Sequence, residues 1–204
     1  MRRLFLFKAV GISLFMWLFF VAYFHTLRHP AFPVLEMPLT ALDRAIPFTP
    51  GALLAYVSLW LYVSLPPGLL LTLRELVVFG LWTAAMCGVG LAFFYFLPTA
   101  VPPQALQVDL AAHPGFAVLQ GVDAAGNACP SLHVATAVFS AFWIDHLLRG
   151  MRAPGGLRGL NYAWVLVIVW STLATKQHVM ADAVAGALLG AAFAAASLRW
   201  RARG

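Results

Sequence analysis

Residues 76–97 read LVVFGLWTAAMCGVGLAFFYFL and contain no charged side chain. A helix of this length rises about 33 Å, which is enough to cross the hydrocarbon core of a bilayer. Hydrophobic residue types make up 62% of the 204-residue chain and charged types only 10%, whereas soluble domains carry roughly 25% charged residues. The composition therefore indicates a helical membrane protein and excludes a soluble enzyme, a disordered chain and a disulfide scaffold.

Five further segments have the length and composition of membrane spans. They cover residues 9–27, 51–71, 130–148, 160–174 and 179–198. We therefore predict an all-α integral membrane protein with six transmembrane helices, folded as a single domain over residues 1–204 with an outer loop at 98–129. The first span follows basic residues as a signal peptide would, but it is long, rich in Phe and Trp, and lacks a small-residue cleavage site, so we expect a retained helix.

Lysine and arginine residues are distributed unevenly between the two sides of this arrangement. With the N-terminus inside, ten of the 13 fall in inner segments, and only Arg28, Arg44 and Lys176 fall in outer ones. Because cytoplasmic segments accumulate Lys and Arg, we predict that both termini are cytoplasmic. The basic residues lie in ones to threes beside apolar runs, which favours membrane orientation and predicts no nucleic-acid partner. Cys87 and Cys129 form no disulfide framework.

One outer cluster, Cys129-Pro130-Ser131-Leu132-His133, begins the fourth predicted span. Proline suits the first helical position, so we expect Pro130 to open this helix, with Ser131 and His133 in its first turn. The unpaired N–H groups and the positive end of the helix dipole there would form an anion site. The alternative is that Ser131 only caps the helix and His133 is an interfacial histidine.

A second outer cluster, residues 171–182, reads STLATKQHVMAD. His178 and Asp182 are four residues apart, so we expect them to share one helical face. A carboxylate that accepts the N–H of one ring nitrogen leaves the other nitrogen as a nucleophile or base. An ionisable residue inside a span indicates function, because its burial is costly. The alternatives are a packing His–Asp pair and, for Lys176, a snorkelling lysine.

The distribution of Lys and Arg places both clusters on the outer side of the membrane, and this inference does not depend on either motif. Two histidines, a carboxylate, a lysine and a helix N-terminus would then meet at one face. This set suits phosphoryl transfer, in which one histidine attacks phosphorus, the other protonates the leaving oxygen, and N–H groups hold the remaining oxygens.

The two clusters resemble motifs of the type-2 phosphatidic acid phosphatase superfamily. Its Pro-Ser-Gly-His motif is matched by residues 130–133, with Leu132 in place of Gly. Its motif of Ser-Arg, five residues, His, three residues and Asp is matched from Ser171 to Asp182, with Thr172 in place of Arg. Both departures resemble the branch that includes inositol phosphorylceramide synthases. The stretches at 46–50 and 95–100, together with Asp123 and Asn127, are also similar to that branch.

The resemblance implies a role for each site residue. His178 would be the nucleophile that forms a phosphohistidine, Asp182 would orient it, and His133 would be the general acid. Phosphate contacts would come from Ser131, Leu132 and Ser171. No metal or cofactor is implied. The family's first motif, Lys, six residues and Arg-Pro, is missing, so Lys176 or Arg44 would have to supply the cation, and an arginine fork is not equivalent to a lysine.

The sequence thus predicts a membrane lipid phosphatase or head-group phosphotransferase, with the 98–129 loop leading into its active site. The lipid phosphate would be phosphatidate, a polyprenyl diphosphate, or a sphingolipid or inositol lipid. The small, Ala-, Leu- and Arg-rich chain predicts a bacterial inner-membrane protein with a periplasmic site. Two alternatives stay open at this point. One is a metal-dependent hydrolase using His133, His178 and Asp182 as ligands, and the other is a non-enzymatic lipid-binding protein.

Overall fold

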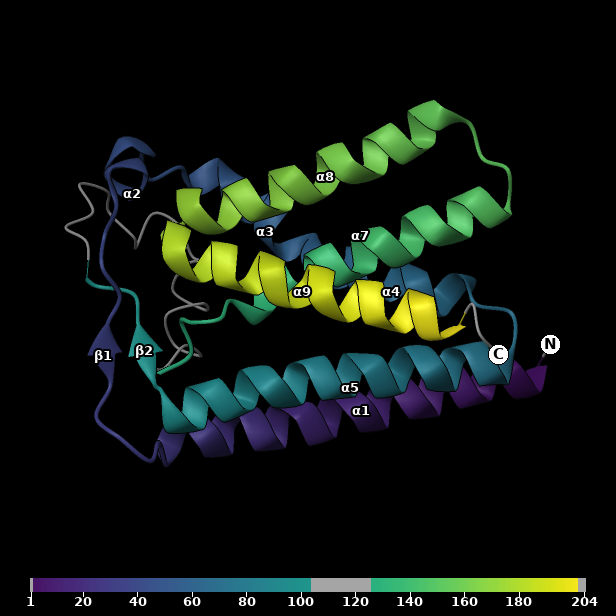
Figure 1. Cartoon of the computed structure of the whole chain (residues 1–204), viewed down its shortest axis with the longest axis horizontal. Helices are drawn as coiled ribbons and strands as arrows, with labels where there is room; N and C mark the ends of the chain where they lie inside the picture. Colours follow the sequence, from purple (N-terminus) through teal and green to yellow (C-terminus); the bar gives the residue numbers. More distant parts are fainter. Residues whose placement is uncertain (1, 104–125, 202–204) are drawn as a thin grey trace.

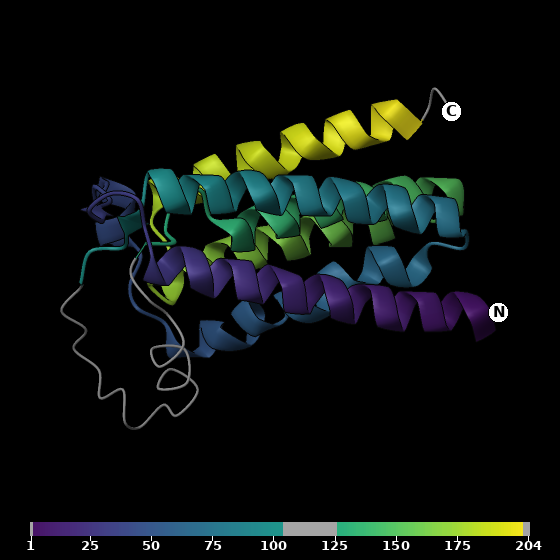
Figure 2. The ribbon, with the colours of Figure 1, turned by 90° about the horizontal axis from the view of Figure 1, so that it is seen from below.

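The computed structural model describes residues 2–103 and 126–201, which are mostly helical with one small parallel sheet. The elements in chain order are α1 (Arg2–Arg28), β1 (Leu35–Glu36), α2 (Ala41–Ala45), η1 (Pro50–Ala52), α3 (Leu53–Val57), α4 (Leu59–Leu69), α5 (Leu73–Phe96), β2 (Thr99–Ala100), α7 (Leu132–Gly150), α8 (Gly155–Ala174) and α9 (Met180–Arg201). The long helices lie side by side along one direction (Figures 1 and 2). α1 begins and α9 ends at one end of the bundle, while α2, β1 and β2 lie at the other (Figure 1). We call this second end the loop end.

Within the described residues, five helical segments are long and apolar enough to cross a membrane. They are Phe5–Arg28, Pro50–Leu69, Leu73–Phe96, Gly155–Ala174 and Met180–Trp200. The predicted helical membrane protein is confirmed at this level. The 19-residue α7 is not among the five, because His133, Asp145, His146 and Arg149 lower its hydropathy. Six spans therefore stay a prediction.

α7 packs against α4, α8 and α9, and several of its polar side chains, such as Ser140 and Asp145, are buried against protein. At its C-terminal end, the buried Asp145 accepts hydrogen bonds from the Nε atoms of Arg149 and Arg158, at 2.8 and 2.6 Å. Near its middle, Phe139 and Trp143 are almost fully buried in the main hydrophobic cluster. A helix enclosed in this way can carry ionisable groups that a lipid-facing helix cannot.

Two glycines of α9 allow this helix to touch the backbone of α7. A Cβ atom added at Gly186 would lie 2.3 Å from the carbonyl oxygen of Ser131, and one added at Gly190 would lie 2.3 Å from that of Ala135. The spacing Gly-x-x-x-Gly is the small-residue pattern with which membrane helices pack closely. The Ala-rich run 181–196 contains this contact.

The structure corrects the predicted start of the fourth span. α7 begins at Leu132, and Ser131 is its N-cap, with its side chain accepting the N–H of Val134 at 3.2 Å. Pro130 therefore precedes the cap and does not open the helix. The cap takes priority because a serine oxygen satisfies an otherwise unpaired N–H of the first turn.

The loop end is tied together by short main-chain pairings. β1 pairs in parallel with β2 in the register Leu35↔Thr99, and Thr99 also bridges to Asn127. The amide of Asn127 hydrogen-bonds the hydroxyl of Tyr23 on α1. Most of the predicted 98–129 loop, including Asp123, lies outside the described residues. Its two described parts meet shortly before α7, where Thr99 accepts the N–H groups of Ala128 and Cys129.

Gly190→Ala should lower the stability of the protein. Alanine improves helix propensity by about 1 kcal/mol, but its Cβ would collide with a backbone carbonyl that cannot move aside, which costs about 1–3 kcal/mol. We expect a lower unfolding temperature in detergent for Gly190→Ala. The matched control is Gly88→Ala on α5, where nothing lies within 4 Å of the added Cβ and no loss is expected. Equal effects at both positions would contradict the close contact.

Candidate active site

Two histidines from distant parts of the sequence meet at the loop end. His133 lies in the first turn of α7, and His178 lies in the turn between α8 and α9. Their ring centroids are 6.4 Å apart, with the planes inclined at 52°. The ring of Tyr56 on α3 stacks on His133 with a centroid distance of 4.1 Å. Helices α3, α7 and the α8–α9 turn therefore build one site.

Each histidine holds a buried ring nitrogen that has no hydrogen-bond partner among the described residues. These atoms are Nε2 of His133 and Nδ1 of His178. The main chain of Tyr56 also hydrogen-bonds the His133 ring. Unpaired buried polar atoms are rare in folded proteins, and they indicate a place where a ligand or water binds.

Asp182 links the two motifs. Its carboxylate is fully buried, lies 3.3 Å from Nδ1 of His178, and accepts the N–H of Val179 at 3.2 and 3.3 Å. Its main-chain carbonyl accepts the N–H of Ser131 at 3.1 Å. The carboxylate and the imidazole are thus at ion-pair distance without an aligned hydrogen bond.

The sequence argument for this pair needs a correction. His178 does not share a helical face with Asp182, because α9 begins only at Met180. The two side chains meet because the carboxylate of Asp182, in the first turn, reaches back to the N–H of Val179 just before the helix. This is the carboxylate half of a capping box.

The three residues expected to contact phosphate lie around this site in different ways. Ser131 is fully buried and caps α7, but a cap uses only an oxygen lone pair, so its hydroxyl proton is left to donate. Leu132 offers a main-chain N–H of the first turn, while its side chain packs over Gly90 of α5. The hydroxyl of Ser171 donates to the carbonyl of Ile168 at 2.6 Å, within its own helix.

The two expected cations are engaged elsewhere. The Nζ atom of Lys176 donates to the carbonyls of Asp43 and Ile46, at 2.8 and 2.6 Å. Arg44 is exposed, and its Nη2 donates to the carbonyl of Leu39 at 3.1 Å. Burial lowers the pKa of the Lys176 ammonium, and the negative charge of Asp43 opposes that shift. An ammonium has three N–H donors, so Lys176 keeps one beyond these two bonds.

Lys176 also ends α8 in a conformation that side chains rarely adopt. Its φ is +58°, and the N–H groups of Lys176 and Gln177 return to the carbonyls of Leu173 and Thr172 at 3.2 and 3.1 Å. This is a Schellman motif, in which glycine normally occupies the left-handed position. The side-chain bonds of Lys176 therefore hold a strained turn directly before His178.

Substitutions at Lys176 should separate these two effects. Lys176→Ala keeps the left-handed strain and loses both carbonyl contacts, whereas Lys176→Gly loses the contacts but relieves about 1 kcal/mol of strain. We expect unfolding temperatures in detergent to fall in the order wild type, Lys176→Gly, Lys176→Ala. A glycine variant at least as stable as the wild type would contradict the role assigned to the side chain, and an alanine variant at least as stable as the glycine variant would contradict the backbone strain.

Comparison with known families agrees with this geometry. The model of the PAP2 superfamily matches residues 51–196, which include His133, His178 and Asp182. The chain belongs to the PAP2 superfamily. Neither the curated proteins nor the solved structures gave a match. The resemblance to the superfamily is thus confirmed, and the resemblance to the inositol phosphorylceramide synthase branch stays a prediction.

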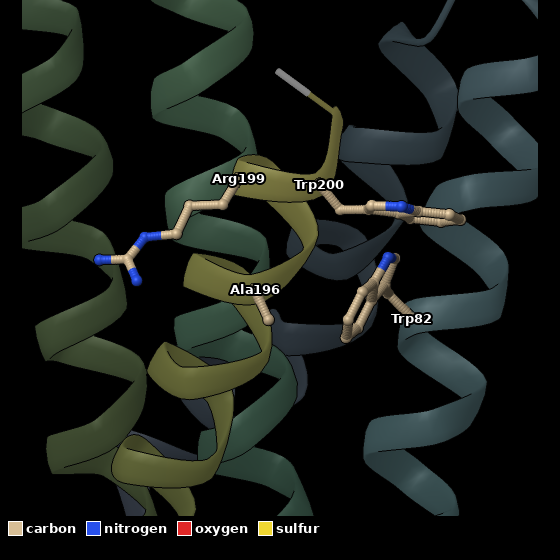
Figure 3. Close-up of a pocket in the computed structure, with 4 residues that line it drawn as sticks. All are labelled: Trp82, Ala196, Arg199 and Trp200. Carbon is tan, nitrogen blue, oxygen red and sulfur yellow. The ribbon is translucent and has the colours of Figure 1, made fainter. Parts of the chain in front are cut away.

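Two other features of this PAP2 protein bear on the choice of site. Among the described residues, no three His, Cys, Asp or Glu side chains are grouped as metal ligands would be. An open hollow of about 350 Å³ lies between α5 and α9, lined by Trp82, Ala196, Arg199 and Trp200 (Figure 3). It lies toward the end of α9, far from the histidines, and the paired tryptophans suit a membrane–water interface.

Sequence reasoning missed Tyr56 and Asp43. Tyr56 stacks on His133 from a helix with no motif, and no spacing rule connects the two. Asp43 is buried at 4% exposure and accepts the N–H of Met180 at 2.7 Å. A signal for Asp43 was present, because Thr40-Ala-Leu-Asp43 has the pattern of a capping box, but its contact with α9 is not readable from the sequence.

Proposed function

We propose that this PAP2 protein is a membrane enzyme that cleaves a lipid phosphate ester through a phosphohistidine at His178. Superfamily membership suggests a lipid phosphatase or phosphotransferase. The observation that carries the proposal is the pair of neighbouring imidazoles at the N-terminus of α7, with Asp182 3.3 Å from Nδ1 of His178 and a buried, unpartnered Nε2 on His133. Such a pair supplies both a nucleophile and an acid within reach of one phosphorus atom.

In the first step, Nε2 of His178 attacks phosphorus and the bond from phosphorus to the leaving oxygen breaks. Asp182, 3.3 Å from Nδ1, favours the tautomer with the proton on Nδ1 and stabilises the positive charge that develops on the ring. His133 gives its proton to the leaving oxygen through Nε2. The first-turn N–H groups of α7, including that of Leu132, and the Ser131 hydroxyl stabilise the phosphoryl oxygens.

In the second step, His133 acts as a base. It takes a proton from water or from an alcohol, whose oxygen attacks phosphorus and breaks the phosphorus–nitrogen bond. Both histidines return to their starting states. Ser171, Lys176 and Arg44 complete the proposed phosphate-binding set, in which the third N–H of Lys176 would supply a positive charge. The chemistry needs no cofactor.

The charge distribution supports placing this site at the outer face of the membrane, with both termini cytoplasmic and six spans in all. α1 begins and α9 ends at the end of the bundle opposite the histidines (Figure 1), as an even number of spans requires. In a bacterial cell the site would face the periplasm from the inner membrane. A lipid substrate could then keep its tails in the bilayer while the head group leaves to water.

The substrate is a lipid phosphate, and phosphatidate, a polyprenyl diphosphate and a sphingolipid or inositol lipid are the classes to test. Hydrolysis and head-group transfer differ only in the molecule that attacks the phosphohistidine, which is water in hydrolysis and an alcohol in transfer. The resemblance to inositol phosphorylceramide synthases favours transfer, whereas the small chain favours hydrolysis. Phosphate release from a lipid phosphomonoester in detergent, without added alcohol, would identify hydrolysis. Turnover only with an alcohol acceptor would identify transfer.

His178→Ala should abolish turnover of whichever lipid phosphate the wild type cleaves, because no other group forms the covalent intermediate. His133→Ala should lower kcat by about 100-fold or more, since general acid–base catalysis contributes roughly that factor. His29→Ala, at an exposed histidine directly after α1, should leave turnover unchanged. Full activity of His178→Ala would eliminate the proposed nucleophile.

Inhibitors distinguish this mechanism from a metal-dependent hydrolase. Vanadate mimics a phosphoryl group with five oxygen or nitrogen neighbours, so we expect it to inhibit the enzyme, and we expect chelators to have no effect. Loss of activity with a chelator, restored by a divalent cation, would support the metal-dependent alternative and contradict the phosphohistidine reaction.

A non-enzymatic lipid-binding protein is the second candidate function. It is favoured by the two missing family cations and by the engagement of Lys176 with main-chain carbonyls. Under this alternative the wild type binds lipid phosphates without turnover, and His178→Ala binds them equally well.

A further inference from the structure

We propose that Asp43 is a positioning residue that holds the His178 turn in place. Asp43 lies on α2, in the loop between α1 and η1, more than 130 positions from His178 in the sequence. Its carboxylate is buried, although none of the proposed chemistry uses it. The proposal rests on the proposed function where it concerns turnover, and on contacts alone where it concerns structure.

The carboxylate of Asp43 uses its two oxygens for different purposes. Oδ2 accepts the N–H and the hydroxyl of Thr40, at 2.7 and 2.6 Å, and so stabilises α2 itself. Oδ1 accepts the N–H of Met180 at 2.7 Å. Met180 is the first residue of α9, and a first-turn N–H has no partner within its own helix. Asp43 therefore caps α9 from a distant segment.

Two further bonds connect the same loop segment to the His178 turn. The N–H of Thr49 donates to the carbonyl of Ala174 at 2.9 Å, at the end of α8. The ammonium of Lys176 bridges the carbonyls of Asp43 and Ile46. Residues 43–49 thus contact the chain on both sides of His178. They bond Ala174 and Lys176 before it and Met180 after it. We call this set of bonds the latch.

The charges favour the latch at neutral pH. Burial alone would raise the pKa of Asp43, but the hydrogen bonds from Thr40 and Met180 and the nearby Lys176 charge outweigh it and lower that pKa below its usual value. The carboxylate is therefore ionised, and a charged acceptor at a helix N-terminus also interacts favourably with the helix dipole. The stabilisation is present above the ordinary carboxyl pKa and is lost as the pH falls through the lowered one.

The latch matters for catalysis because the other contacts of His178 are limited. Its main-chain N–H donates to the carbonyl of Thr172 at 3.1 Å, and its ring lies 3.3 Å from the Asp182 carboxylate. Its ring nitrogen Nδ1 has no aligned hydrogen bond among the described residues, and its backbone follows the strained turn at Lys176. The orientation of the imidazole therefore depends on where the turn is held. A displacement of about 1 Å in a reacting group can cost 100-fold in rate.

The test uses the full chain purified in detergent, with Asp43→Ala, Asp43→Asn and the control Glu36→Ala. Glu36 is an exposed carboxylate of the same loop, on β1. Hydrogen exchange by mass spectrometry reports on the turn, in peptides covering residues 176–182 and, for comparison, 160–170. Phosphate release from dioleoyl phosphatidate, or from the lipid phosphate that the wild type cleaves best, gives kcat and KM.

We expect Asp43→Ala to speed exchange at 176–182 by about tenfold or more while 160–170 stays protected. We expect kcat to fall by about tenfold or more with a much smaller change in KM, because substrate contacts remain while the nucleophile is displaced. Asp43→Asn, whose amide oxygen can still accept the Met180 N–H, should give an exchange rate and a kcat between those of Asp43→Ala and the wild type. Glu36→Ala should match the wild type.

Unchanged exchange at 176–182 in Asp43→Ala would overturn the latch, and faster exchange with unchanged kcat would overturn its positioning role. If Asp43→Ala unfolds throughout, Asp43→Asn decides, and identity with the wild type in both measurements would contradict the proposal. If the wild type turns over no lipid phosphate, the proposed function fails, while the exchange data still decide whether the latch exists.

Discussion

The close contact between α7 and α9 is the constraint on which the site depends. Gly186 and Gly190 allow the α9 backbone to reach the carbonyls of Ser131 and Ala135, and the N–H of Ser131 bonds the carbonyl of Asp182. This contact brings the start of α7 to the start of α9, and with it His133 to within 6.4 Å of His178. Larger side chains at the two glycines would separate the helices and the two histidines together. The geometry of the reacting groups is thus set by helix packing.

The second requirement is that His178 lies outside a helix and must still be held. Two carboxylates from different segments hold the main chain directly after His178. Asp182 pairs with the N–H of Val179 from within α9, and Asp43 pairs with the N–H of Met180 from the loop before η1. Both place negative charge at the N-terminus of α9, where the helix dipole favours it. The two carboxylates hold the turn but do not bind phosphate. In the proposed site, phosphate binding therefore depends mainly on N–H donors and not on a pair of arginines.

The sequence predicted the features that appear as local patterns, namely apolar runs of membrane-span length and catalytic motifs. Apolar runs predicted the helices, and the family model match confirms the superfamily that motifs at 130–133 and 171–182 indicated. It failed where the outcome depended on a competing local interaction or a distant partner. α7 does not begin at Pro130, because Ser131 is its N-cap and Leu132 its first residue. The bonds from Lys176 to the carbonyls of Asp43 and Ile46 could not be predicted either, and the role of Lys176 in phosphate binding stays a prediction. Neither Tyr56 nor Asp43 could be assigned, because their contacts join segments that no spacing rule connects.

The most direct test of the account is to trap the covalent intermediate. The full-length protein would be mixed with a lipid phosphate carrying ³²P, quenched within one turnover, and digested for peptide mapping. The account predicts label on the peptide that contains His178, in a linkage that is stable to alkali and labile to acid, and no label in His178→Ala. Label on another residue, or turnover in a protein that never becomes labelled, would contradict it.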